Sequence, residues 1–154
     1  MRNHGVHWLA GIALFGWCAF IFGTSCTVIL PHDFFAWIAR NALTDEASFQ
    51  RFALFWGCCW FAIVKGWHAF EFAVMCTLAR LVLNRPSPST PHRNIILAAV
   101  FSLMFAASDE YHQTFVPDRG GTVQDTLIDS LGIGLVTIIA LRRLSRQHVA
   151  DVTS

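Results

Sequence analysis

Charged residues are scarce in this chain of 154 residues: Asp, Glu, Lys and Arg together make up 14% of it, whereas soluble domains carry about 25%. Between Arg2 and Asp33 there is no charged residue, and hydrophobic residues account for 55% of the whole chain. This composition excludes an ordinary soluble domain and predicts a membrane protein. The length allows a single domain over residues 1–154, and no internal repeat is visible.

Other missing features narrow the function. The net charge is only +1, without the clustered basic face of a nucleic-acid-binding protein, so nucleic acid is not an expected partner. No G-x-S-x-G, P-loop or Rossmann fingerprint occurs. The five cysteines are scattered through apolar segments without metal-ligand spacing, which favours a role for them as small buried hydrophobic residues.

Four apolar segments are candidates to cross a hydrocarbon core of about 30 Å, although the last two are short or polar at one end. They cover residues 8–30, 66–83, 94–112 and 126–141. A cleaved signal peptide is the alternative for the first segment, but the apolar part of a signal peptide reaches only about 15 residues. Residues 84–93, NRPSPSTPHR, form a Pro/Ser loop.

The segment between the first two spans, residues 31–65, is rich in aromatic residues and is neither a clean span nor a polar loop. It predicts one or two amphipathic helices that lie at the membrane interface and lead into the second span. The predicted fold class is therefore all-α: an integral membrane bundle of four transmembrane helices with an interfacial amphipathic helix after the first. Residues 142–154 form a tail, and the lipid bilayer is the expected environment.

Basic residues collect on one side of these spans. Nine of the ten acidic residues fall on the other side, and only Asp151 does not. Because basic loops stay in the cytoplasm, the pattern predicts a multi-pass protein of the cytoplasmic (inner) membrane with both termini in the cytoplasm. The seven of eleven basic residues on that side are Arg2, Arg80, Arg85, Arg93, Arg142, Arg143 and Arg146.

Polar side chains gather at the outer ends of three predicted spans. Residues three or four apart share one face of a helix, and leaving each such group in lipid costs on the order of 3 kcal/mol. We therefore expect these groups to turn toward one another and form a single polar pocket that opens outward. They are Lys65, His68 and Glu71 at the second span, Asp109, Glu110, His112 and Gln113 at the third, and Asp125 and Asp129 at the fourth.

Two sequence elements carry a family resemblance. KGWHAFEF, residues 65–72, resembles the K-x-x-H-x-x-E-[FY] element of VanZ-like membrane proteins. SDEYHQTFVPDRGGTVQDTLIDSLG, residues 108–132, resembles their D-E-x-H-Q-x-F-x-P-x-R…D-x-x-x-D/N-x-x-G element. The similarity extends from residue 25 to about 140. It departs from the family at Asp118, where Gly often precedes the Arg.

The resemblance implies a small four-span protein of the cell envelope. It also implies a link to glycopeptide-antibiotic or envelope-stress response, since the founding VanZ-like protein is associated with low-level resistance to teicoplanin. It implies no particular reaction.

The residues of the expected pocket divide into two sets of candidates. The catalytic candidates, which suit acid–base chemistry, are His112, Glu110, Asp109, His68 and Glu71. The substrate-binding candidates are Arg119, Lys65, Gln113, Asp125 and Asp129. The H-x-x-E and D-x-x-H spacings also allow a divalent metal between neighbouring helices. The alternative is a hydrogen-bonded network that only fixes helix packing.

Arg119 and Lys65 suit an anionic headgroup or phosphate, unless Arg119 pairs with nearby acids such as Asp109, Glu110 or Asp125. Two classes of function follow. One is an envelope enzyme or modifier that acts on an anionic or lipid-linked envelope precursor. The other is a non-enzymatic binding or accessory protein that holds an anionic lipid or a partner helix. Gly132 and Gly134 are expected to permit close helix contact. The sequence leaves the oligomeric state open.

Overall fold

The computed structural model describes residues 4–28, 31–42, 45–83 and 90–153. These residues form five α-helices and no strand, which confirms the all-α class. The helices are α1 (His4–Ser25), α2 (Pro31–Ala42), α3 (Glu46–Leu83), α4 (Pro91–Gln113) and α5 (Val123–Thr153).

Three helices are long and apolar enough to cross a membrane by length and composition: α1 from His7 to Ser25, and all of α3 and α4. Within the described ranges α5 is not among them. Its charge-free stretch, residues 130–141, rises only about 18 Å, which is short of a core of about 30 Å. The apolar composition of the long helices nevertheless indicates a membrane protein.

Two of the predicted span boundaries differ from the helices. The first span was expected to reach residue 30, but α1 ends at Ser25, and residues 29 and 30 lie outside the described ranges. The second span, residues 66–83, is the latter half of a longer helix, because α3 begins at Glu46 and continues without a break. The third span, residues 94–112, lies inside α4.

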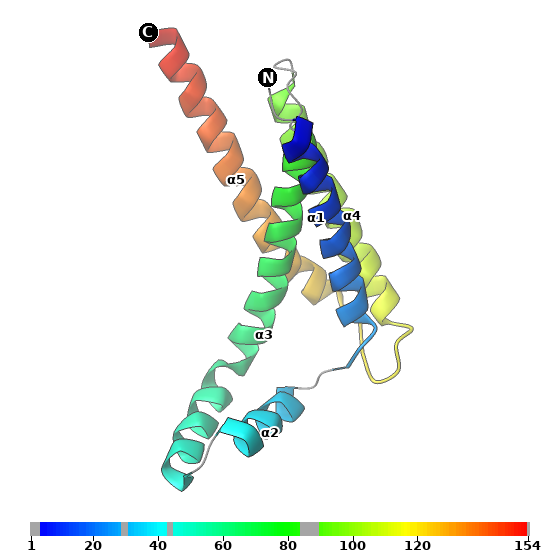
Figure 1. Ribbon diagram of the computed structural model, residues 1–154, viewed down its shortest axis with the longest axis vertical. Helices are drawn as coiled ribbons and strands as arrows, with labels where there is room; N and C mark the ends of the chain where they lie inside the picture. Colours follow the sequence, from blue (N-terminus) through cyan, green and yellow to red (C-terminus); the bar gives the residue numbers. More distant parts are fainter. Residues whose placement is uncertain (1–3, 29–30, 43–44, 84–89, 154) are drawn as a thin grey trace.

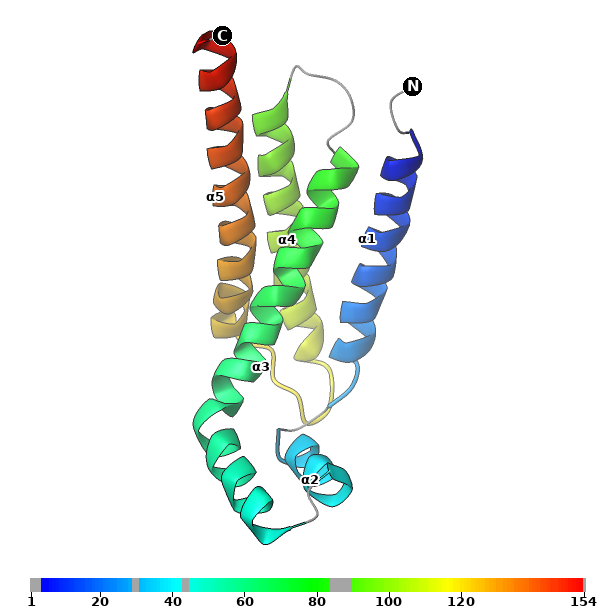
Figure 2. The same cartoon turned by 60° about the vertical axis from the view of Figure 1, so that its left-hand side comes forward.

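The four long helices lie side by side (Figures 1 and 2). α3 is central, since it contacts α1, α2, α4 and α5. We call the end where α1 and α4 begin and α3 and α5 finish the terminal end, and the opposite end the loop end. The start of α1 and the finish of α5 therefore lie at the same end, while α2 and the first half of α3 project beyond the loop end (Figure 2).

Small residues let the helices approach closely. Ala98, Ser102 and Ala106 follow one another every four residues along α4, and none is exposed. A Cβ atom added at Gly132 on α5 would lie 1.8 Å from the carbonyl oxygen of Ala69 on α3. The expected close contact is therefore present at Gly132. It is absent at Gly134, where nothing lies within 4 Å, because two residues along a helix turn the Cα–Cβ direction to the opposite side.

The projecting segment is held together by aromatic stacking. Phe35 of α2 stacks on Phe52 of α3 with ring centroids 5.3 Å apart, and Phe34 lies 5.3 Å from Trp56. Asp45 caps the start of α3, because the Ser48 N–H donates to its Oδ1 at 2.8 Å. That hydrogen bonding from Ser48 lowers the pKa of Asp45.

The outer faces of the helices are apolar, with Trp8, Phe15 and Leu131 among the exposed side chains. Apolar patches of this extent mark a surface that is covered in the working protein.

The cysteines were expected to be small buried residues. Cys76 is buried as expected, but Cys26 and Cys58 are exposed, so the expectation of burial is wrong for these two.

Candidate functional site

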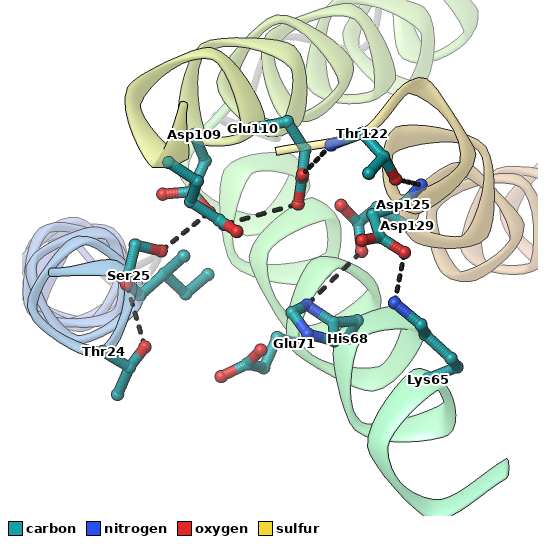
Figure 3. Close-up of polar contacts among 12 residues, drawn as sticks. Thr24, Ser25, Lys65, His68, Glu71, Asp109, Glu110, Thr122, Asp125 and Asp129 are labelled. Carbon is teal, nitrogen blue, oxygen red and sulfur yellow. Dashed lines mark hydrogen bonds and ion pairs between the residues drawn. The ribbon is translucent and has the colours of Figure 1, made fainter. Parts of the chain in front are cut away.

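A cavity of about 370 Å³ opens at the loop end between α1, α3, α4 and α5. Seven of the ten candidate residues line it, so most of the polar groups expected to converge do surround one space. They are Lys65, His68, Glu71, Asp109, Gln113, Arg119 and Asp125. The remaining three, Glu110, His112 and Asp129, are not among its lining residues. Figure 3 shows how the charged groups of α3, α4 and α5 face one another here.

Asp109 joins α1 to α4. Its Oδ2 accepts hydrogen bonds from Ser25 Oγ and from Gln113 Nε2, both at 2.8 Å, as Figure 3 shows for the Ser25 contact. Its Oδ1 is buried and has no hydrogen-bond partner among the described residues. One oxygen of Asp109 therefore holds the helices together, and the other is left as an unused acceptor.

Arg119, in the loop between α4 and α5, binds main-chain groups at the end of α1. Its Nη1 donates to the carbonyl oxygens of Thr24 at 2.8 Å and Thr27 at 2.6 Å, and its Nε donates to Gln113 Oε1 at 2.9 Å. Carbonyl groups at a helix C-terminus favour a cation, and α1 has no basic residue in its last turn. Arg119 supplies that cation from another part of the chain.

The pairing of Arg119 with a carboxylate, one of the two alternatives for this residue, is not observed among the described residues. Among the described residues it forms no ion pair with Asp109, Glu110 or Asp125. Its donors are instead taken by carbonyl groups and by the Gln113 amide, whose partner Asp109 lies one step further along the network.

Glu110 fixes the start of α5. Its Oε2 accepts the N–H of Thr122 at 2.9 Å, and its Oε1 accepts from Gln113 at 3.3 Å. The Thr122 hydroxyl in turn accepts the N–H of Asp125 at 3.1 Å, which is a helix N-cap. A Cβ atom added at Gly121 would lie 1.7 Å from the Glu110 carbonyl oxygen, so the loop passes directly against the end of α4.

One ion pair and one histidine–carboxylate contact link α3 to α5 (Figure 3). Lys65 forms an ion pair and hydrogen bond with Asp125. One turn further along, His68 Nδ1 lies 3.9 Å from Asp129 Oδ1. Asp129 is fully buried, and within the described part of the chain neither of its oxygens has a hydrogen-bond partner.

Glu71 is a second buried acceptor in the cavity wall. It is only 4% exposed, and its Oε1 lacks a hydrogen-bond partner among the residues described. Its main-chain oxygen accepts the indole N–H of Trp17 at 2.9 Å, which ties this turn of α3 to α1. Glu71 therefore contacts α1 through its main chain, while its side-chain Oε1 is available to accept a hydrogen bond.

His112 turns away from the cavity. Its ring lies 4.7 Å from that of Phe22 on α1, and its Nδ1 is buried without a hydrogen-bond partner in the described ranges. Sharing a helix face with Asp109 did not bring it into the cavity wall. Of the two histidines considered for acid–base chemistry, only His68 lines the cavity.

The family model described as VanZ/LLP1 matches residues 10–144, nearly the whole chain. The chain belongs to the VanZ/LLP1 family. Comparison with curated proteins and with solved structures gives no match. Membership of the VanZ/LLP1 family supports a general role in the cell envelope or in antibiotic resistance, and both elements that carried the resemblance lie inside the matched range.

The departure from the VanZ-like pattern at Asp118 has a structural consequence. Asp118 has a φ of 61°, in the left-handed region that glycine adopts without strain. Asp is one of the few other residues that tolerate this conformation. The turn before Arg119 is closed in this VanZ/LLP1 protein by the Arg119 N–H, which donates to the Val116 carbonyl at 3.2 Å.

The described residues offer no ligand set for the divalent metal that the H-x-x-E and D-x-x-H spacings allowed. In the described part of this VanZ/LLP1 chain, no three His, Cys, Asp or Glu side chains are grouped so that they could share a metal ion. The acids are distributed over different partners instead: Asp109 with Ser25, Glu110 with Thr122, and Asp125 with Lys65.

Three residues of the site were not among the candidates drawn from the sequence. Ser25 is buried against Asp109, Thr122 caps α5, and Gly121 touches the end of α4. Thr122 could have been found, because a Thr three residues before an Asp at a helix start is a capping pattern. Ser25 and Gly121 carry no such local signal.

Proposed function

We propose that this VanZ/LLP1 protein is a single domain that crosses the cytoplasmic membrane with α1, α3, α4 and α5, while α2 lies at the interface. α5 is included because it packs against both α3 and α4. The described arginines at the terminal end support a cytoplasmic position for that end. They are Arg80, Arg93, Arg142, Arg143 and Arg146.

Cysteine labelling tests this topology. In a variant whose five native cysteines are replaced by alanine, Gly120→Cys should react with an impermeant maleimide in intact cells, because Gly120 lies in the exposed loop at the loop end. The matched position is Ser145→Cys on the exposed side of α5 near the terminal end, which should react only after permeabilisation. The opposite order of labelling would reverse the proposed orientation.

The loop-end cavity, in this proposal, binds the polar head of an anionic or lipid-linked envelope component. The observation that carries it is the pair of buried, unpartnered carboxylate oxygens, Glu71 Oε1 and Asp109 Oδ1, on residues that line one cavity. Buried acceptors are stabilised when they receive a hydrogen bond. A ligand with hydroxyl or amino groups supplies the donors, and its phosphate can take Lys65 from Asp125.

The rim of the cavity favours a lipid-linked ligand over a soluble one. Trp67 and Val28 line it and are 50% and 37% exposed, so an apolar chain attached to the head can continue along the membrane-facing side. Glu71, Asp109, Asp118 and Asp125 outnumber the cations in the lining. That balance favours a head rich in hydroxyl or amino groups beside its phosphate, and not a bare polyanion.

A second candidate function is chemistry on that head. His68 lines the cavity while the buried Asp129 lies 3.9 Å behind its Nδ1, and a base oriented by a carboxylate is a recurrent acid–base arrangement. In this case the protein is an envelope-modifying enzyme with His68 as acid or base. His112, which faces Phe22, is the weaker choice.

A lipid-binding experiment on the protein in nanodiscs tests both candidate functions. The ligand is a polyprenyl-phosphate-linked amino sugar, and polyprenyl phosphate and phosphatidylcholine serve as comparisons. Glu71→Gln and Lys65→Gln should each weaken binding of the sugar-bearing lipid about tenfold, since one lost polar contact amounts to roughly 1.4 kcal/mol. His68→Gln should leave binding intact and, if the second candidate holds, slow conversion about a hundredfold.

Glu46→Gln is the matched control, because Glu46 is an exposed carboxylate on the same helix outside the cavity. It should bind like the wild type. If the wild type binds no lipid head, and the cavity variants lower only the thermal midpoint, the cavity residues serve helix packing alone. That outcome would support the accessory or structural alternative.

A further inference from the structure

A second polar cavity, of about 270 Å³, lies at the terminal end between α3, α4 and α5. Its polar lining consists of Arg80, Asn94, Arg143 and Gln147, and none of the lining residues that the structure describes is a carboxylate. The contrast with the acid-rich cavity at the loop end is clear. A cavity with two guanidinium groups and no acid has an unbalanced positive charge.

Arg80 is the half-buried member of this pair. Its Nε is buried and has no hydrogen-bond partner among the described residues, and no ion pair with Arg80 occurs there either. It sits in the last turn of α3, where a cation favourably faces the helix dipole. That interaction leaves the Nε donor itself unused, and a buried charged donor without a partner is unfavourable.

The start of α4 adds a second positive element. α4 begins at Pro91 and, although Thr90 stands at the N-cap, no side chain caps it and its first turn has no acid. The amide of Asn94 donates to the Leu83 carbonyl at 2.9 Å, which holds this helix start against the end of α3. Pro91 and Asn94 both line the cavity. An uncapped helix N-terminus attracts anions through its free N–H groups and its dipole.

We propose that the terminal-end cavity binds a phosphate-bearing anion, with Arg80 and Arg143 as its guanidinium ligands. Guanidinium groups match phosphate geometry with paired N–H donors. Arg143 is exposed and can contact an anion that enters from outside, while Arg80 contacts it on the inner side of the cavity. The site does not depend on the function proposed for the loop end, because the two cavities share no lining residue.

The phosphate can come from an anionic phospholipid headgroup or from a soluble phosphate. A basic cavity between apolar helices is the kind of interhelical site that binds lipid headgroups. Arg93, Arg142 and Arg146 are the exposed neighbours in sequence. The two sources share one chemistry, and they differ in whether an acyl chain is needed.

Binding to delipidated protein in a neutral detergent tests the proposal. The probes are phosphatidylglycerol, phosphatidylcholine and inorganic phosphate, with bound lipid counted by native mass spectrometry and affinity taken from thermal shifts. Phosphatidylglycerol should bind in preference to phosphatidylcholine. Each lost arginine should weaken it on the order of fivefold, because a basic residue near an anionic headgroup contributes about 1 kcal/mol. The double variant Arg80→Gln/Arg143→Gln should therefore lose roughly 25-fold.

The matched control is Arg142→Gln/Arg146→Gln, which removes the same charge from exposed positions of α5 outside the cavity. It should retain binding within about twofold. Competition by millimolar inorganic phosphate would identify a soluble phosphate as sufficient, and lack of competition would identify the lipid headgroup. Equal losses in both double variants, or no preference for phosphatidylglycerol in the wild type, would overturn the proposal.

Two further variants keep the result interpretable. If Arg80→Gln/Arg143→Gln does not fold, Arg143→Gln alone changes only an exposed side chain and should still show the fivefold loss. Because the head of phosphatidylglycerol carries a phosphate and hydroxyl groups, the loop-end cavity can also hold it, and Lys65→Gln identifies any lipid bound there. A bound lipid lost only in Lys65→Gln belongs to the loop end, and one lost only in Arg143→Gln belongs to the terminal-end cavity; no lipid lost in Arg143→Gln would overturn the proposal.

Discussion

Gly132→Ala is expected to destabilise the protein by about 3 kcal/mol, because it adds a methyl group where two helix backbones touch. The new Cβ would lie 1.8 Å from the Ala69 carbonyl oxygen and 3.2 Å from the Ala73 nitrogen. These atoms belong to the backbone of α3 and cannot rotate aside, so the two helices must separate. Overpacking of this kind costs about 1–3 kcal/mol and occasionally more. The thermal midpoint in detergent, followed by tryptophan fluorescence, measures it.

Gly134→Ala is the control from the same helix, two residues away. Nothing lies within 4 Å of a Cβ at Gly134, and alanine is favoured over glycine in a helix by up to about 1 kcal/mol. Its midpoint should equal or exceed that of the wild type. Similar losses in the two variants would mean that α3 and α5 are not in close contact at Gly132.

The Gly132 contact also matters for the cavity. Lys65 and His68 are on α3, and their partners Asp125 and Asp129 are on α5. Because Gly132 is less than one turn beyond Asp129, separating the helices there moves Lys65 away from Asp125 and His68 away from Asp129. A stability loss in Gly132→Ala should therefore be accompanied by weaker ligand binding at the loop end.

The convergence of polar groups could be predicted from the sequence because it depends on two simple quantities. Helical spacing put Lys65, His68 and Glu71 on one face of α3, and the free-energy cost of leaving such groups in lipid turned that face inward. Both are local or additive properties of the chain. The same reasoning predicted which end of α4 and of α5 contributes.

The partner of each group could not be predicted in the same way. Asp109 shares a helix face with both His112 and Gln113, but those two residues differ by about 100° around the helix axis. Gln113 turns to Asp109 and Arg119, whereas His112 turns to Phe22. Which neighbour occupies each side depends on where α1 docks, and that is a tertiary property.

The hydrogen-bond acceptors of Arg119 could not be predicted from the sequence for a related reason. Its acceptors at Thr24 and Thr27 are main-chain carbonyl groups, which every residue possesses and which leave no signature in the side-chain pattern. The nearby acidic residues therefore made pairing of Arg119 with a carboxylate an alternative. The continuity of α3 was missed because residues 46–65 mix charges with aromatic residues and do not resemble an ordinary span.

Arg119→Gln is expected to loosen the end of α1 and to lower the free energy of unfolding by about 3 kcal/mol. Hydrogen bonds from a charged donor contribute roughly 1.5–3 kcal/mol each, and they are not additive. Arg119 makes three, and two of them hold the carbonyl groups of Thr24 and Thr27. The measurements are the thermal midpoint and hydrogen exchange over residues 20–28, which should become faster.

Arg51→Gln is the appropriate control, since Arg51 is exposed and its Nε donates only to the Ala47 carbonyl of its own helix. It should change stability by less than about 0.5 kcal/mol and leave exchange at the end of α1 unaltered.

Arg119→Lys adds a further distinction, because lysine keeps the charge but loses the planar fork that reaches several acceptors at once. If Arg119 fastens α1, the lysine variant should recover only part of the lost stability. If Arg119 is instead a ligand for an anionic head, Arg119→Gln should leave the midpoint and the exchange of α1 unchanged while lipid-head binding falls. A lowered midpoint with faster exchange confined to α1 therefore assigns Arg119 to positioning the cavity wall, and it leaves Lys65 as the cation available to a ligand.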